Sequence, residues 1–377
     1  MTDIKNPDSP QLSSLPPIPK TRIISIDAFR GFTVLAMIFV IQVAGYKNLP
    51  LSFPQFGSPV VSTFLHAEAA YPEGTPKEGK IGCTFTDLVA PFFVFIVGLC
   101  IPLSRKRRGV EWWRHVLTRT FLLYLLGVVY ISLVLKLSYW WGILQAIAVA
   151  YFIGSVMMVF PAIWRWVVVA VIAIFHSYMS VHFRWWQHIG NEQMPFLTIE
   201  NLIGDPLRPL TVHCTPWASI SWGLITIVGT LLGESLLSRS HKKIITSSLI
   251  IGIALTVIGY IIHRINYPVY AMNKETVSSS YAIFTSGISA LTFLIFYIIN
   301  DIIGWVKWAV PFTVFGSNAL LGYFMQPVVR IFITALGFRG FFIDKSGWMG
   351  VYMGLVWTAL LWVVVLWFNK KKIYWRI

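Results

Sequence analysis

Charged residues are scarce in this chain. Only 12% of its 377 residues are Asp, Glu, Lys or Arg, about half the share of an ordinary soluble domain. In contrast, 56% are hydrophobic, and the mean hydropathy is +0.69. A soluble fold of this size cannot bury that much apolar surface, so the sequence excludes a soluble protein and predicts a lipid bilayer as the solvent.

Cysteine and acidic residues are also few. The three cysteines, Cys83, Cys100 and Cys214, have neither the spacing of metal ligands nor that of a disulfide framework, and we expect no bound metal. The 15 acidic residues against 30 basic ones give a net charge of +15. In a soluble chain this excess would indicate nucleic acid, but here the basic residues lie in short stretches between apolar runs. Such stretches encode orientation in a membrane, so we expect no nucleic-acid partner.

The apolar runs predict an all-α polytopic protein of about ten transmembrane helices. A helix needs about 20 apolar residues to cross the hydrocarbon layer. Suitable runs lie near residues 24–45, 87–104, 115–135, 140–160, 164–182, 217–237, 244–263, 281–300, 309–336 and 348–368. Residues 1–21 are rich in Pro and Ser and have no apolar core, so we predict a disordered cytoplasmic tail before one transmembrane domain at 22–377.

The loop charges predict the orientation. The turns after even-numbered spans hold basic stretches such as RKRR at 105–108, and the chain closes on NKKKIYWRI. The positive-inside rule therefore places both termini in the cytoplasm. Aromatic residues near the span ends, Trp112 and Trp375 among them, indicate interfacial belts. The large apolar faces with glycines also allow a homodimer.

Ionisable residues inside membrane spans are costly and indicate function by default. Asp27 and Arg30 lie three residues apart on one face of the first span, near its cytoplasmic end. One interpretation is an interfacial ion pair that reaches toward water. The other is that Arg30, with the basic cluster at 105–108, receives a phosphate-bearing ligand, because a planar guanidinium matches phosphate oxygens.

Further polar residues lie at or inside the other spans. Asp87 opens the second span, where it is either a helix cap or a carboxylate that orients a histidine. Gln145 and Asn318 are typical of hydrogen bonds between neighbouring helices. His66, in the predicted first outer loop, is either an ordinary loop residue or the group that performs chemistry, since imidazole titrates near neutral pH.

Several stretches together resemble one known family. They are RIISIDAFRGFTVLAMIFVIQ at 22–42, HAE at 66–68, GCTFTDLVAPFFVFIVGLCIPLS at 82–104, WWGILQAIAVAY at 140–151, NKETVSSSYAIFTSGISAL at 273–291 and PFTVFGSNALLGY at 311–323. In this order, over roughly residues 22–377, the chain resembles the family of heparan-alpha-glucosaminide N-acetyltransferase and its bacterial relatives. The resemblance implies a membrane-embedded acyltransferase that moves acetyl from cytoplasmic acetyl-CoA to an amino sugar or glycan on the outer face. It also implies the plasma or inner membrane of a bacterium.

The resemblance also implies roles for individual residues. The catalytic pair is His66 and Asp87, with His66 as proton acceptor or as transient acetyl carrier. The residues expected to contact the acceptor or the oxyanion are Gln42, Asn318, Gln145, Asn273 and Lys274. The residues expected to bind acetyl-CoA are Asp27, Arg30, Arg105 and Arg107. Two other functions remain open: a transporter for amino sugars or related metabolites, and a non-enzymatic membrane scaffold.

Overall fold

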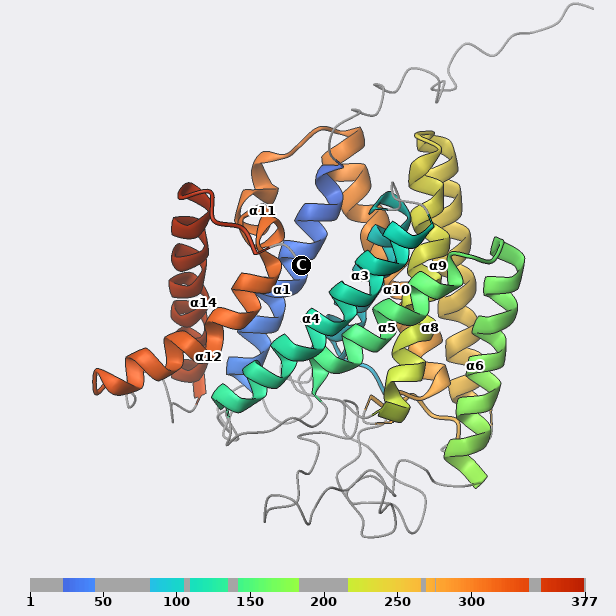
Figure 1. Ribbon diagram of the computed structural model, residues 1–377, viewed down its shortest axis with the longest axis horizontal. Helices are drawn as coiled ribbons and strands as arrows, with labels where there is room; N and C mark the ends of the chain where they lie inside the picture. Colours follow the sequence, from blue (N-terminus) through green and yellow to red (C-terminus); the bar gives the residue numbers. More distant parts are fainter. Residues whose placement is uncertain are drawn as a thin grey trace, which may run out of the picture.

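The computed structural model describes residues 23–44, 82–104, 109–134, 142–182, 216–265, 269–274, 276–338 and 347–375, and these fold into a helical bundle (Figure 1). The first helices are α1 (Ile24–Ala44), α3 (Phe85–Ser104), α4 (Val110–Val134), α5 (Ile143–Met157) and α6 (Ala162–His182). They are followed by α8 (Pro216–Leu237), α9 (His241–Arg264), α10 (Ser279–Tyr297), the π-helical η4 (Ile298–Ile302) and the 3₁₀ turn η5 (Lys307–Ala309). The last are α11 (Val310–Ser317), α12 (Ala319–Ala335) and α14 (Gly347–Lys370).

The all-α prediction is confirmed, since the described part of the chain contains helices and no strand. Eight helical segments are long and apolar enough to cross a membrane, while α5 and α12 are apolar but shorter. Each of the ten predicted apolar runs overlaps one of these helices. The ninth run, 309–336, is not one helix, because Asn318 leaves the helical conformation (φ −142°, ψ 48°) and separates α11 from α12. These helices fit a multi-pass membrane protein.

The helices form an inner and an outer group. In the most apolar stretch of α8, 83% of residues are buried, against 17% in α6. Helix α8 contacts α3, α5, α6, α9 and α10, whereas α6 and α14 lie at opposite edges of the bundle in Figure 1. The exposed side chains of α6 are mostly apolar, including Ile163, Val171 and Ile174. Lipid is as apolar as these side chains, so the outer helices need no polar face.

Helices α3 and α8 approach each other at backbone distance. A Cβ atom on Gly98 would lie 2.2 Å from the carbonyl oxygen of Thr226. From the other side, a Cβ on Gly229 would lie 2.4 Å from the carbonyl oxygen of Phe95. Small residues allow this approach, which gives membrane helices their packing energy in the absence of a hydrophobic force between them.

Helices α1 and α11 make an equally close contact. A Cβ on Gly31 would lie 1.6 Å from the Phe312 carbonyl oxygen, and one on Gly316 would lie 1.9 Å from that of Asp27. The start of α1 is fixed separately, since the Asp301 carboxylate accepts hydrogen bonds from the backbone N–H groups of Ile24 (3.1 Å) and Ser25 (3.0 Å). These contacts cap free N–H groups and set the position of Asp27 and Arg30 on the next turn.

We expect Gly31→Ala to destabilise the bundle, because the added carbon overlaps backbone that cannot rotate away. The loss should be about 1–3 kcal/mol or more, the range for overpacked cores. A lower thermal unfolding midpoint in detergent measures it. Ala170→Val, which also enlarges a small helical residue but at an exposed position of α6, is the matched control and should unfold near the wild-type midpoint. Equal midpoints for Gly31→Ala and wild type would show that α1 and α11 do not pack this closely.

Candidate functional site

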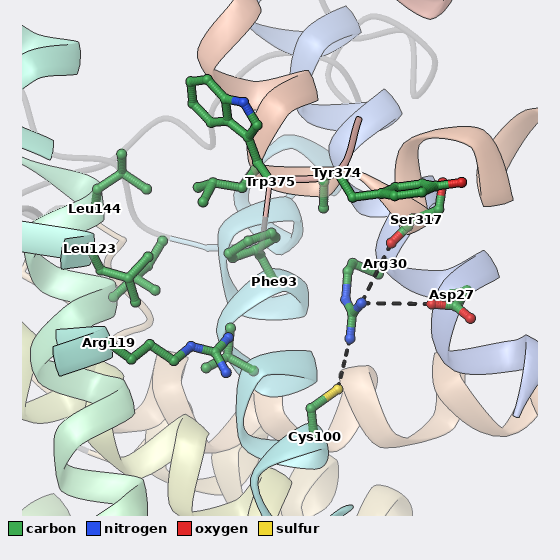
Figure 2. Close-up of a pocket in the computed structure, with 15 residues that line it drawn as sticks. Asp27, Arg30, Phe93, Cys100, Arg119, Leu123, Leu144, Ser317, Tyr374 and Trp375 are labelled. Atoms are coloured by element: carbon green, nitrogen blue, oxygen red, sulfur yellow. Dashed lines mark hydrogen bonds and ion pairs between the residues drawn. The ribbon is translucent and has the colours of Figure 1, made fainter. Parts of the chain in front are cut away.

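A cavity of about 650 Å³ lies among α1, α3, α4, α5, the α11–α12 break and the C-terminal segment (Figure 2). Its volume is in the range of ligand pockets. The residues that line it are Asp27, Arg30, Phe93, Val97, Cys100, Arg119, Leu123, Leu144, Ile147, Gly316, Ser317, Ala319, Leu320, Tyr374 and Trp375. The charged residues among them are two arginines and one aspartate, so the cavity has a net positive charge and favours an anionic ligand.

Arg30 reaches into this cavity from α1. Its guanidinium donates from Nη2 to Cys100 Sγ at 2.9 Å and from Nη1 to the Gly316 carbonyl oxygen at 3.5 Å, and Nη1 lies 3.7 Å from Asp27 Oδ1. Figure 2 shows these three contacts around one guanidinium. The expected pairing of Asp27 with Arg30 is therefore present, and both side chains line the cavity.

Arg119 supplies a second cation from α4. Its guanidinium carbon lies 4.6 Å from the ring centroid of Tyr151 on α5, a cation–π contact. Its Nε is buried and has no hydrogen-bond partner among the described residues. In Figure 2 the Arg119 and Arg30 guanidinium groups enter the cavity from different sides. Two fixed guanidinium groups around one space can contact separate oxygens of a polyanion.

The cavity extends along α3 toward the start of that helix. Its lining residues on α3 run from Cys100 to Phe93, about 10 Å at 1.5 Å per residue. Asp87 lies about 9 Å further along the same helix. The cavity therefore lies in the C-terminal half of α3, and a second polar cluster surrounds the N-terminal end.

Asp87 is the centre of that second cluster. Its side chain is 1% exposed, and Oδ2 accepts hydrogen bonds from the backbone N–H (3.1 Å) and the hydroxyl (3.0 Å) of Thr84. Since α3 begins at Phe85, Thr84 precedes the helix and Asp87 is its third residue, whose carboxylate satisfies the Thr84 N–H. The interpretation of Asp87 as the helix cap is therefore wrong, because Asp87 already lies inside the helix. Oδ1 lies 3.7 Å from Nζ of Lys274, and the Tyr281 hydroxyl donates to the Asp87 backbone carbonyl.

Residues that precede α10 contribute to this cluster. Asn273 shapes the loop: its side-chain oxygen accepts from the Thr276 N–H at 3.3 Å, and its backbone exchanges hydrogen bonds with Ser278. Lys274 is only 9% exposed, so its ion pair with Asp87 is buried. Burial raises the pKa of the nearby Cys83 thiol well above its usual range, and the Asp87 carboxylate raises it further, so Cys83 is a neutral thiol.

Two predicted acceptor residues lie elsewhere. Gln145 is fully buried at the start of α5, where its side-chain oxygen accepts from the Gly142 N–H at 3.1 Å. Asn318 lies at the α11–α12 break and bonds to Asn369 and to the C-terminal segment. Asn318 thus links α12 to α14, as expected of a polar residue between membrane helices, whereas the Gln145 bond caps the start of its own helix. Asn273 and Lys274, in contrast, join Asp87 in one cluster.

The remaining predictions lie outside the described residues. They are His66, Arg105 and Arg107, together with the side chain of Gln42, whose backbone belongs to α1. Within the described ranges, no group of three or more His, Cys, Asp or Glu side chains gathers in the manner of a metal site.

Of the residues that line the cavity, sequence reasoning named only Asp27 and Arg30 as site residues; among those that it missed are Cys100, Arg119, Tyr374 and Trp375. Among these four residues, Arg119 had a signal in the sequence, because it is a charged residue within the apolar run at 115–135. Trp375, which the sequence predicts to belong to an interfacial belt, also lines the cavity.

We expect Lys274→Met to leave Asp87 as a buried carboxylate without its cation. Removing one partner of a buried pair costs about 3–5 kcal/mol. Asp87→Asn combined with Lys274→Met should cost less than the sum of the single changes, because the neutral pair leaves no isolated charge. Unfolding midpoints of the four proteins in the double-mutant cycle measure this, with Lys243→Met on the exposed start of α9 as control. Strictly additive losses would show that the two side chains do not interact.

Comparison with known proteins agrees with the predicted resemblance over part of the chain. No protein-family model matches. Human heparan-alpha-glucosaminide N-acetyltransferase is 31% identical over 162 residues, which cover 39% of this chain and 20% of that protein. The match thus spans about a fifth of the human protein's length. By sequence, this helical membrane protein is similar to heparan-alpha-glucosaminide N-acetyltransferase.

Proposed function

We propose that this protein is a membrane-embedded acetyltransferase that takes acetyl from cytoplasmic acetyl-CoA and transfers it to an amino sugar or glycan on the outer face. The chain crosses the membrane ten times, with both termini in the cytoplasm, and α5 and the α11–α12 pair complete the spans. The observation that carries the proposal is the cavity with two guanidinium groups, in a bundle that is similar to an N-acetyltransferase.

In this proposal the cavity is the donor site. Arg30 and Arg119 bind the phosphates of acetyl-CoA, assisted by Arg105 and Arg107 at the cytoplasmic end of α3, and Asp27 holds the Arg30 guanidinium. The phosphates enter from the cytoplasm because the N-terminal end of α1 and the C-terminal end of α3 lie on that side. The acyl arm then points along α3 toward Asp87, whose cluster begins about 9 Å beyond Phe93.

The chemistry takes place near Asp87. His66, in the loop between α1 and α3, accepts a proton from the acceptor amine. At the same time the amine nitrogen attacks the carbonyl carbon of the thioester. The carbon–sulfur bond then breaks, and coenzyme A leaves as the thiol or thiolate. In the two-step variant, the imidazole first carries the acetyl group. Asp87 stabilises the histidine cation, and Lys274 and Asn273, with Gln42, bind the acceptor or the developing oxyanion.

A sugar transporter is the second candidate, favoured by the helix break at Asn318. Discontinuous helices that line a cavity are typical of transporters. The two functions separate in one assay, because a transporter moves intact labelled sugar into vesicles without acetyl-CoA. A scaffold does neither.

We expect His66→Ala to abolish acetyl transfer from radiolabelled acetyl-CoA to glucosamine while acetyl-CoA binding is retained. General base catalysis contributes about 10²–10⁴-fold, so the residual rate should fall by at least 100-fold. Purified protein in nanodiscs is the appropriate sample, and His182→Ala, at an exposed position of α6, is the control with full activity. Full activity of His66→Ala would remove His66 from the mechanism.

We expect Arg30→Gln to raise KM for acetyl-CoA about tenfold or more with a smaller change in kcat, because a charge-assisted contact to phosphate is lost. Arg114→Gln, which removes an exposed arginine of α4, should leave KM unchanged. A loss of kcat alone in Arg30→Gln would place Arg30 near the reacting atoms and not at the phosphates.

A further inference from the structure

The described C-terminal segment folds back into the bundle. Helix α14 ends at Lys370, and Lys372 has a positive φ of 58°, which reverses the chain. The reversal is closed by backbone hydrogen bonds from Lys372 to Asn369 and from Ile373 to Phe368. In Figure 1 the C mark accordingly lies in the middle of the view, between α1 and α3 and away from the end of α14. Residues 373–375 therefore return to the bundle, where Tyr374 and Trp375 line the cavity.

Two asparagines hold this segment in place. Asn318 is 1% exposed; its Nδ2 donates to the Ile373 carbonyl oxygen (2.8 Å) and to Asn369 Oδ1 (3.2 Å), and its Oδ1 accepts from the Trp375 N–H (3.0 Å). Asn369 Nδ2 donates to the Val314 carbonyl oxygen (2.8 Å) and to the Ser317 hydroxyl (3.0 Å). These bonds tie the segment to the helix break that borders the cavity.

The segment brings two aromatic rings to the cavity. Tyr374 and Trp375 both line it, on the wall that also holds Ser317 (Figure 2). The Trp375 ring packs against Phe324 of α12 with 5.2 Å between centroids, which limits its rotation. Both side chains remain more than a third exposed, so the bundle core does not enclose them.

Aromatic rings and guanidinium groups in one cavity form a set that suits a nucleotide. Bases stack on aromatic side chains, and phosphates bind arginine forks. Arg119 has a buried Nε without a hydrogen-bond partner among the described residues, and Arg30 shares its charge with a single aspartate. A ligand with one flat aromatic end and several phosphate oxygens uses both kinds of contact.

We propose that the C-terminal segment is the base-recognition element of the donor site: Tyr374 and Trp375 bind the adenine of a coenzyme A thioester, and Arg119 binds its phosphates together with Arg30. This inference rests on the proposed function for the identity of the donor. It adds that recognition depends on the nucleotide end of the donor, and it assigns Asn318 and Asn369 as positioning residues that hold the aromatic wall.

The test measures binding without any transfer reaction. Calorimetric titration of purified protein in nanodiscs uses adenosine 3′,5′-bisphosphate and, separately, inorganic pyrophosphate. Wild type should bind the bisphosphate more tightly than pyrophosphate. Trp375→Ala should weaken bisphosphate binding about tenfold, the typical effect of losing one stacking ring, and Trp375→Phe should restore most of it. Trp367→Ala, at an exposed tryptophan of α14, is the matched control and should bind as wild type.

Two further variants test the aromatic and the phosphate contacts separately. Tyr374→Ala tests the same wall if Trp375→Ala does not fold. Arg119→Gln should weaken the binding of both probes, whereas the aromatic variants should weaken only that of the bisphosphate. Equal binding of pyrophosphate and bisphosphate by wild type would overturn base recognition and leave an anion site, such as one for a lipid headgroup.

A kinetic comparison separates this inference from the proposed function. Trp375→Ala should raise KM for acetyl-CoA about tenfold and leave KM for S-acetylpantetheine, which lacks the nucleotide, unchanged. Bisphosphate binding that depends on Trp375, in a protein without acetyl transfer, would uphold the nucleotide site and refute the acetyltransferase. Acetyl transfer with the same KM in wild type and Trp375→Ala would uphold the acetyltransferase and refute the aromatic wall.

Discussion

The close approach of helix backbones at glycine is the constraint on which the site depends. Gly31 and Gly316 let α1 and α11 touch, and Gly98 and Gly229 do the same for α3 and α8. Because a Cβ at any of these positions would overlap a carbonyl group, the contacts fix the register of each helix pair. Arg30 precedes Gly31, and the Gly316 carbonyl accepts from it. The contacts that hold the bundle together therefore also set the position of the cation in the cavity.

The helix break at Asn318 is the second determinant of the cavity. An unwound residue inside a membrane protein leaves backbone groups that must find partners, and such breaks are tolerated where protein buries them or a cavity adjoins them. Here the side-chain amide of Asn318, at the break, forms hydrogen bonds with the backbone of the C-terminal segment. The ninth apolar run is thus divided into two helices, and residues on both sides of the break line the cavity.

Helix α3 connects two polar sites of different character. One end holds a buried Asp87–Lys274 ion pair. The other end borders a larger cavity with an excess of positive charge. Ionisable side chains inside membrane proteins usually form ion pairs with one another or contact a substrate. The paired carboxylate suits orientation of a reacting group, and the net positive cavity suits an anionic donor. This division supports the proposed reaction, in which the two substrates come from opposite sides of a membrane.

The sequence by itself determined the helices, because apolar runs of fixed length are required by the bilayer. It also determined the Asp27–Arg30 pair, because a spacing of three residues places both on one face of a helix. It did not determine the break within 309–336, since an asparagine among apolar residues is compatible with a continuous helix. Only the tertiary structure joined Lys274 to Asp87, or Arg119 and Trp375 to Arg30. Those contacts link helices far apart in the chain, and they depend on glycine-limited packing distances that no periodicity in one segment encodes.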